Sequence, residues 1–372
     1  MGSNGKSRET KTINLALQGG GSHGAFTWGV LDALLEDGRL KIDSISGTSA
    51  GAMNAVALVD GWVRDGAEGA RQSLYDFWFA VSKKGRFSPI QRTALDVLWG
   101  SWNLEFSPSY RAYNLFSRMF SPYDLNLLDL NPLRDVVDAE VDFDHVHTCS
   151  DIKVFISATN VWTGKVRVFR PEELTPDVVM ASACLPTVFK AVEIEGIPYW
   201  DGGFGGNPAL FPFFYETDTE DCLLVQINPI ERRATPKTAL EIQDRMNEIT
   251  FNAALLREFR AIEFVRRLKE DGRLEGTSYR TLRMHRVSAD AVVEDLSAST
   301  KINAEWDFLQ YLHGIGRAAA QDFLDEHFNA IGEKATLDLS EELSPDILPD
   351  RRRKSIGGHM REAMTRLRPG GG

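Results

Sequence analysis

The fold is decided by the stretch INLALQGGGSHGAFTWGVLDALLEDGRLKIDSISGTSAGAMNAVALVD, which spans residues 13–60. A short apolar run at 13–18 ends in three glycines, which predicts a buried strand. Residues 25–37 place apolar side chains on one face and predict a helix. The pair repeats, with a strand predicted at 42–46 and a helix at 50–60. Strand, helix, strand and helix at this spacing predict a parallel βαβ unit and an α/β fold.

The turn after the second predicted strand carries the motif GTSAG at residues 47–51. A GxSxG turn between a strand and a helix pushes its serine hydroxyl out of the sheet. Gly47 and Gly51 lack the Cβ atoms that would collide in so tight a bend. The N-terminus of the following helix offers free N–H groups to an oxyanion. The motif therefore predicts Ser49 as a nucleophile.

The turn after the first predicted strand carries GGGSHG at residues 19–24. Consecutive glycines present bare N–H groups that bind anions, and in an acyl hydrolase this nest is the oxyanion hole. Gly19, Gly21 and Gly24 also satisfy GxGxxG, the pyrophosphate loop of a dinucleotide-binding fold. That fold expects an acidic residue at the end of the second strand, and Asp43 comes too early for it. A Rossmann-like dinucleotide-binding protein is therefore kept as the alternative.

A third motif is Asp201-Gly202-Gly203, which follows a predicted hairpin at residues 193–200. Asp-Gly is common in β-turns, so this motif alone indicates only a turn. The glycine nest, GTSAG and the Asp-Gly-Gly motif 152 positions after the serine together resemble the patatin-like phospholipase family. The segment ASACLP at 181–186 is similar to the small-residue segment that precedes the family's Asp motif. The resemblance covers roughly residues 13–210.

The resemblance implies a three-layer α/β/α patatin-like fold with a mainly parallel central sheet and an inserted helical segment. It also implies a lipid acyl-ester hydrolase of phospholipase A or lysophospholipase type, with a Ser-Asp dyad, no cofactor and no metal. By motif match, Ser49 is the nucleophile and Asp201 the general base, with Gly47 and Gly51 in the elbow. The same match implies an oxyanion hole formed by Gly19, Gly20, Gly21, Ser22, His23 and Gly24.

The sequence departs from the family at His23, where Arg or Lys is usual. A histidine carries its charge only part of the time near neutral pH, so a permanent positive charge is not expected there. The dyad itself requires a shielded site. A carboxylate with an ordinary pKa near 3.9 is a weak base, and burial raises its pKa.

Three other histidines suggest different chemistry. His285 follows Ser49 and Asp201 in the chain, as the histidine of a Ser-His-Asp triad would, but no motif surrounds it. We interpret it as structural and keep the triad as a rival mechanism. His145 and His147 alternate with acidic residues in a way that suggests a metal site. We interpret that stretch as a solvated turn and predict no metal.

Composition restricts the partners and the location. The net charge of −11 argues against nucleic-acid binding, which needs clustered basic residues. The three cysteines are odd in number and far apart, as is typical of free thiols in a reducing compartment. No run of 18 apolar residues occurs, so no transmembrane helix is expected. We expect a cytoplasmic protein that acts on a phospholipid or another acyl lipid, and peripheral contact with an anionic membrane stays open.

Residues 1–10 are expected to be a disordered lead, 11–335 the hydrolase domain and 336–372 a flexible tail, first acidic and then basic. Residues 62–130 are rich in aromatic side chains and are expected to form a helical insertion. This insertion is either a lid or acyl-chain pocket, or simply a satellite core. A lipid-binding scaffold without catalysis is the third functional hypothesis.

Overall fold

The computed structural model describes residues 9–345 and 357–367, except positions 87, 89, 94–95, 98, 100, 106, 127–128, 233, 278–279 and 294–295. The basic residues at 351–354 of the predicted tail lie outside the described residues. None of the helices in the described part is both long and apolar enough to cross a membrane.

The centre of the described structure is an eight-stranded sheet with the strand order β5-β6-β3-β2-β1-β7-β8, and β4 pairs with β3. The strands are β1 (Lys11–Leu17), β2 (Leu40–Gly47), β3 (Lys153–Asn160), β4 (Val166–Phe169), β5 (Val192–Ile194), β6 (Ile197–Asp201), β7 (Asp221–Gln226) and β8 (Arg283–Ser288). Strands β3, β2, β1, β7 and β8 run parallel, whereas β4, β5 and β6 extend the sheet in antiparallel pairings.

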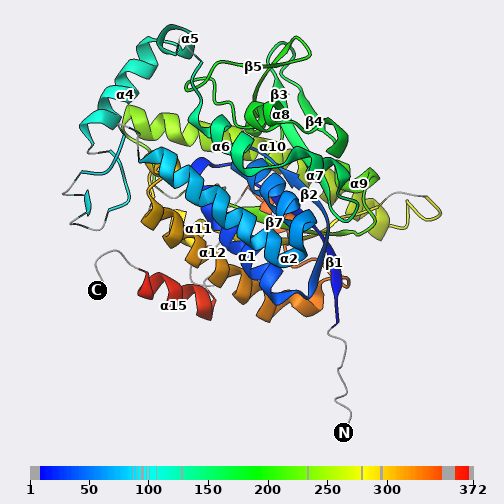
Figure 1. Ribbon diagram of the computed structural model, residues 1–372. Coiled ribbons are helices and arrows are strands. Elements are labelled where there is room, and N and C mark those ends of the chain that lie inside the picture. Colours follow the sequence, from blue (N-terminus) through cyan, green and yellow to red (C-terminus); the bar gives the residue numbers. More distant parts are fainter. Residues whose placement is uncertain are drawn as a thin grey trace.

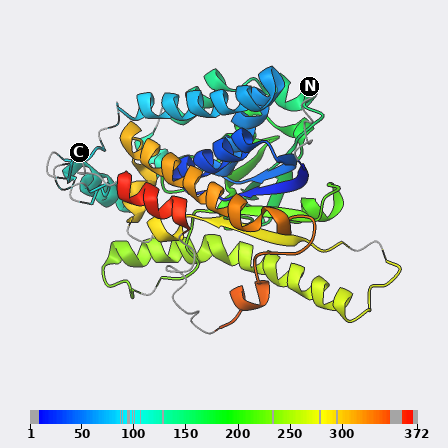
Figure 2. The same ribbon diagram turned by 90° about the horizontal axis from the view of Figure 1, so that it is seen from below.

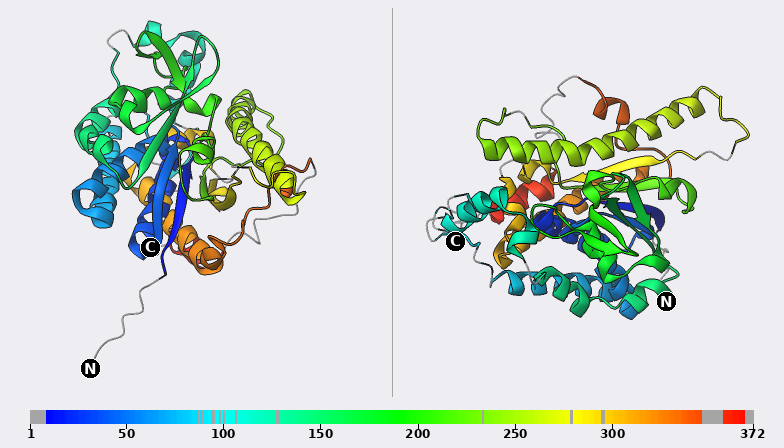
Figure 3. Two further views of the ribbon diagram at one scale, coloured as in Figure 1. Left: turned by 90° about the vertical axis from the view of Figure 1, so that its right-hand side faces the viewer. Right: turned by 90° about the horizontal axis from the view of Figure 1, so that it is seen from above.

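Helices cover both faces of this sheet (Figures 1 and 2). One face carries α1 (Gly24–Asp37), α2 (Ala50–Gly85) and α12 (Trp306–His327), and the long helix α10 (Ala239–Glu270) lies across the other (Figure 3). A hydrophobic core lies on each face of the sheet, and alternate side chains of β1 contribute to the two cores. Leu15 and Leu17 pack on the α1 side, and Ala16 packs on the α10 side. The α/β class, the mainly parallel sheet and the three layers are therefore confirmed.

The remaining helices are short and surround this framework. They are α4 (Pro108–Met119), α5 (Pro122–Leu125), α6 (Pro132–Glu140), α7 (Phe143–Thr148), α8 (Pro176–Ser182), α9 (Pro212–Tyr215), α11 (Asp290–Val293), α13 (Leu339–Glu342) and α15 (Gly358–Arg366). The 3-10 turns are η1 (Gly21–His23), η2 (Pro171–Glu173), η3 (Gly202–Phe204), η4 (Ala298–Ile302) and η5 (Phe328–Ala330).

The side chains of Thr175 and Thr238 cap α8 and α10, because each accepts a backbone N–H of the first helical turn. The predicted helix at 50–60 forms the first part of α2, which continues beyond it to Gly85. Its path breaks at Asp65 and Gly66, where Gly66 adopts a φ of 55°. The stretch from 62 to 85, placed in the predicted insertion, is therefore part of α2.

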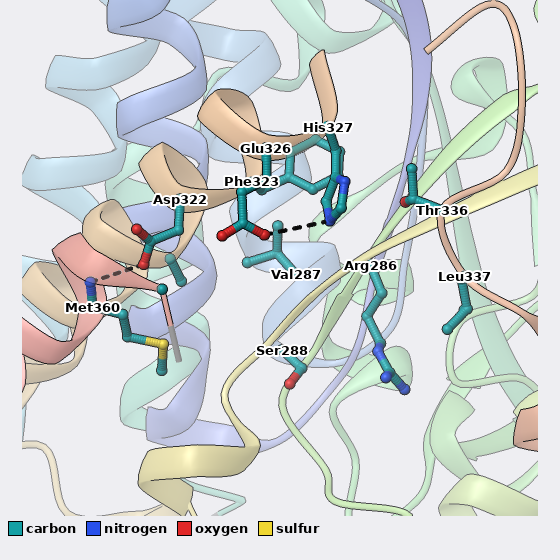
Figure 4. Close-up of a pocket in the computed structure, with 12 residues that line it drawn as sticks. Arg286, Val287, Ser288, Asp322, Phe323, Glu326, His327, Thr336, Leu337 and Met360 are labelled. Carbon is teal, nitrogen blue, oxygen red and sulfur yellow. Dashed lines mark hydrogen bonds and ion pairs between the residues drawn. The ribbon is translucent and has the colours of Figure 1, made fainter. Parts of the chain in front are cut away.

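The tail forms more structure than a flexible segment would. The Asp322 carboxylate of α12 accepts the backbone N–H groups of His359 and Met360, both at 2.9 Å, and so holds the start of α15 (Figure 4). Met360 is buried, and Leu367 packs against Gly314 of α12. Apolar side chains of α15 therefore pack against α12. A pocket of about 190 Å³ lies beside this contact, and its lining residues include Arg286, Glu326 and His327.

Candidate active site

The two glycine motifs leave the sheet side by side. Strands β1 and β2 are parallel neighbours, and Leu17 pairs with Gly47 at their carboxyl ends. The loop at 19–24 and the turn at 47–51 therefore start from adjacent points on one edge of the sheet. This edge is where α/β proteins place ligand sites, because the connecting loops converge there.

Ser49 occupies the strained turn that the motif predicted. Its backbone has φ 54° and ψ −120°, a conformation that a non-glycine residue rarely adopts. A Cβ on Gly47 would come within 2.7 Å of the Gly51 backbone, and one on Gly51 within 2.2 Å of the Leu17 carbonyl oxygen. Both glycines are thus required by close backbone approach, and the turn presents Ser49 at the start of α2.

The glycine loop lies directly against this serine. A Cβ on Gly19 would come within 2.6 Å of the Ser49 Cβ, and one on Gly24 within 2.6 Å of the Ala50 Cβ. The ring of Trp78 also leaves no room for a side chain at Gly24. The loop glycines therefore pack against the nucleophile turn, and this contact favours the hydrolase interpretation over a pyrophosphate loop.

Free backbone donors gather in the same loop. Within the described part of the chain, no acceptor is bonded to the N–H groups of Gly20, Gly21 and Ser22. Gly19 itself is held at both ends: its N–H donates to Asn207 Oδ1 at 2.8 Å, and its carbonyl accepts from Asn228 Nδ2 at 2.6 Å. The loop is thus fixed at Gly19 and leaves its next three donors available to an anion.

Asp201 lies at the end of β6, buried to 1% exposure. Its Oδ1 accepts the N–H of Gly203 at 2.7 Å, and the Ser49 hydroxyl is near enough to lower the pKa of the carboxyl group. A Cβ on Gly202 would come within 2.1 Å of the Ser157 carbonyl oxygen of β3. The first glycine of the motif is therefore needed because the turn runs tightly along β3, which is more than a plain β-turn requires.

Burial raises the pKa of Asp201 to about 7, and this is the largest influence on the group. The Gly203 N–H, the Ser49 hydroxyl and the positive charge of Lys301 act in the opposite direction. A carboxylate with a pKa close to the working pH is a far better base toward a hydroxyl than one with an ordinary pKa.

The segment at 181–186 joins the two motifs. Ser182 Oγ accepts the backbone N–H of Ser49 at 2.9 Å, and the Cys184 carbonyl accepts the N–H of Asp201 at 2.8 Å. One short segment therefore fixes the backbone of both residues of the predicted dyad.

His23 is not the half-charged group that the sequence suggested. It is buried, and its Nε2 shares a 2.7 Å hydrogen bond with Thr300 Oγ1. Burial, with the nearby charges of Lys301 and Arg232, holds its pKa well below the usual value. The imidazole is therefore neutral near pH 7, and the expectation of partial charge is wrong.

Lys301 is the group near the site that the sequence analysis missed. It lies in η4, and its Nζ donates to Asn228 Oδ1 at 3.0 Å. Its charge acts on both His23 and Asp201. No motif surrounds it in the sequence, so only its packing against the glycine loop reveals it.

The other histidines take structural roles. His285 lies on β8 and bonds Asp221 Oδ1 and Thr336 Oγ1, each at 3.0 Å, so it does not orient Ser49. His145 bonds the buried Asp60 at 2.8 Å, and His147 bonds the Leu174 carbonyl oxygen at 2.6 Å. Both belong to α7, so the interpretation as a solvated turn is wrong. Across the described residues, no three His, Cys, Asp or Glu side chains gather as a metal site would require.

A family model described as patatin-like phospholipase matches residues 15–214, a range that includes Ser49, Asp201 and the glycine loop. The chain belongs to the patatin-like phospholipase family. The resemblance drawn from the three motifs is thereby confirmed, and family membership supports a lipid-hydrolase activity. No curated protein matches the chain.

Two solved structures show weak similarity to this family member. VipD from Legionella pneumophila has a TM-score of 0.38 and 15% identity, over 99% of this chain and 79% of that one. The effector ExoU has a TM-score of 0.29 and 14% identity, over 96% of this chain and 70% of that one. Similarity this low does not transfer an activity from either protein.

Proposed function

We propose that the protein is a lipid acyl-ester hydrolase of phospholipase A or lysophospholipase type that works through a dyad of Ser49 and Asp201. The observation that carries the proposal is the buried Asp201 carboxylate, with a pKa of about 7, on which the hydroxyl of Ser49 acts from a strained strand-to-helix turn. A strained, shielded nucleophile beside a tuned base is typical of covalent catalysis.

In the first half-reaction, Ser49 Oγ attacks the ester carbonyl carbon while its proton passes to Asp201. The N–H groups of Gly20, Gly21 and Ser22 receive the negative charge that forms on the carbonyl oxygen. The bond to the alcohol then breaks, and Asp201 returns the proton to the leaving oxygen. In the second half-reaction, Asp201 takes a proton from a water molecule, and the water oxygen attacks the carbonyl carbon of the acyl-serine. The fatty acid leaves, and the proton returns to Ser49.

The described part of the predicted insertion supports an acyl-lipid substrate. Helices α4 and α5 project from the body of the molecule (Figure 1), and they expose Leu115, Phe116, Met119, Phe120, Tyr123 and Leu125. The rings of Phe116 and Phe120 stack with centroids 6.2 Å apart, yet both are largely in solvent. A satellite core would bury these rings, so we assign this surface to contact with the acyl chain or the lipid surface.

A fluorophosphonate probe tests the proposal, because it labels only an activated serine. The wild type should be labelled, Ser49→Ala should be silent and Asp201→Asn nearly so, whereas Ser150→Ala, at an exposed serine, should label like the wild type. Released fatty acid from phospholipid vesicles gives the matching activity. An unlabelled wild type would reject the hydrolase. Lipid binding would then favour the scaffold, and binding of a dinucleotide the Rossmann-like alternative.

A further inference from the structure

The acyl-transfer site needs positive charge, and His23 does not provide it. The transition state places negative charge in the glycine loop, close to the carboxylate of Asp201, and a neutral imidazole cannot balance either charge. Two cations act on His23, namely Lys301 and Arg232. Arg232 is bound to both carboxylate oxygens of Glu248, at 2.7 and 2.8 Å. The guanidinium of Arg232 is therefore directed at Glu248, and the cation tied to the glycine loop is Lys301.

The segment around Lys301 is built against the glycine loop. A Cβ on Gly21 would come within 2.3 Å of the Lys301 carbonyl oxygen, so the two backbones touch. The preceding residue, Thr300, holds His23 through its hydroxyl. The 3-10 turn η4 thus contacts the glycine loop at Gly21 and at His23, and it places Lys301 beside the loop.

The ammonium group of Lys301 is tied to the same loop through one amide. Nζ donates to Asn228 Oδ1 at 3.0 Å, and Asn228 Nδ2 donates to the Gly19 carbonyl at 2.6 Å. Among the described residues, Asn228 is the one hydrogen-bond partner of this ammonium, which carries three N–H donors.

The charges around Lys301 come from several elements. Asp244 and Glu248 of α10 and Asp201 at the end of β6 favour its protonated form. Burial, which is the largest influence, and the charge of Arg232 lower its pKa. In return, Lys301 lowers the pKa of Asp201, whose other neighbours are the Ser49 hydroxyl and the Gly203 N–H. Lysine and base are thus electrostatically coupled across the site.

We propose that Lys301 is a positioning residue of this hydrolase: held by Asn228, its ammonium fixes the glycine loop and supplies the positive charge that favours the oxyanion. The inference rests on the proposed function, since it concerns the same reaction. It assigns the electrostatic role to a residue far along the chain from the loop it serves.

The test compares Lys301→Met with the wild type on a soluble, neutral short-chain ester. Removal of one oxyanion-hole donor lowers kcat on the order of 10²-fold or more, so we expect kcat to fall by about 10- to 100-fold with little change in KM. Loss of the charge also raises the pKa of Asp201, so the acid limb of the pH profile should move to higher pH. Lys301→Arg should keep the limb in place, and Lys153→Met, at an exposed lysine at the start of β3, should match the wild type.

Lys301→Gln guards against a variant that fails to fold, because its amide can still donate to Asn228 without carrying charge. Wild-type kcat and an unmoved acid limb in a folded neutral variant would overturn the inference. So would a loss confined to anionic phospholipids, which would make Lys301 a headgroup contact. Fluorophosphonate labelling of the wild type separates these results from failure of the proposed function, since an unlabelled wild type rejects the hydrolase itself.

Discussion

Gly19 and Ser49 lie so close that a Cβ on the glycine would stand 2.6 Å from the Cβ of the serine. The second nearest atom to such a Cβ is the Thr48 carbonyl oxygen at 2.9 Å. Neither atom is the end of a flexible side chain, so neither can move aside easily. The oxyanion loop and the nucleophile turn are therefore a single packed unit, and their spacing depends on one missing methyl group.

This contact predicts that Gly19→Ala separates the loop from the serine. We expect ester hydrolysis to fall by about 100-fold, comparable with the loss of an oxyanion donor. The melting temperature should also fall, because overpacking costs about 1–3 kcal/mol. Gly358→Ala is the matched control, since its Cβ would meet nothing within 4 Å. Equal activity of both variants would mean that the loop can shift freely.

The raised pKa of Asp201 predicts the pH dependence of hydrolysis. The base works only when deprotonated, so kcat/KM should be high above pH 7 and fall as the pH drops through about 7. The profile is measured with a soluble ester whose own ionisation does not change in this range. An acid limb near pH 4 would show that the carboxylate is not shielded and would contradict the assignment.

The same shift predicts that Asp201 lowers stability at alkaline pH. Its folded pKa of about 7 lies above the ordinary value of 3.8, so the folded state favours the protonated form and stability is lost as the pH rises from about 4 to 7. Asp201→Asn removes the charge and should stabilise the fold at pH 8 by about 1–4 kcal/mol while abolishing hydrolysis. Denaturant unfolding at pH 8 and pH 4 checks this, with a smaller gain expected at pH 4. A loss of stability at pH 8 would refute the prediction.

The exposed rings of α4 predict a chain-length effect. Phe116→Ala combined with Phe120→Ala should reduce hydrolysis of long-chain esters several-fold more than that of short-chain esters, because the rings contact lipid rather than the core. The melting temperature should hardly change, since Phe116 is 52% and Phe120 43% exposed. Equal losses for both chain lengths, with a lower melting temperature, would assign the rings to the core.

His285 separates the dyad from the rival triad. His285→Ala removes a buried partner of Asp221 and should destabilise the fold by about 3 kcal/mol, yet leave kcat close to the wild-type value. Unfolding and kinetics are measured on the same preparation, at a temperature where the variant is folded. A folded but inactive variant would favour the triad.

Local patterns in the sequence were enough to place the predicted nucleophile turn. A strand, a glycine turn and a helix need only nearby residues, so 13–60 specified β1, α1, β2 and the start of α2. The tight bends at Gly47 and Gly51 follow from the same local geometry. The resemblance to the patatin-like phospholipases then implied that Asp201 pairs with Ser49, although β2 and β6 are separated by β3 in the sheet.

The properties of the site were decided by tertiary structure, because each depends on residues far apart in the chain. Burial and the nearby charges of Lys301 and Arg232 hold the pKa of His23 well below its usual value, and no pattern around residue 23 could show this. Lys301 reaches the loop only because η4 packs on Gly21. Asp201 reaches a pKa of about 7 because the fold removes it from water. The sequence alone determined the nucleophile turn and the glycine loop, whereas long-range packing brought Lys301 to them and set the protonation of His23 and Asp201, since protonation depends on the solvent and charges that the complete fold leaves around a group.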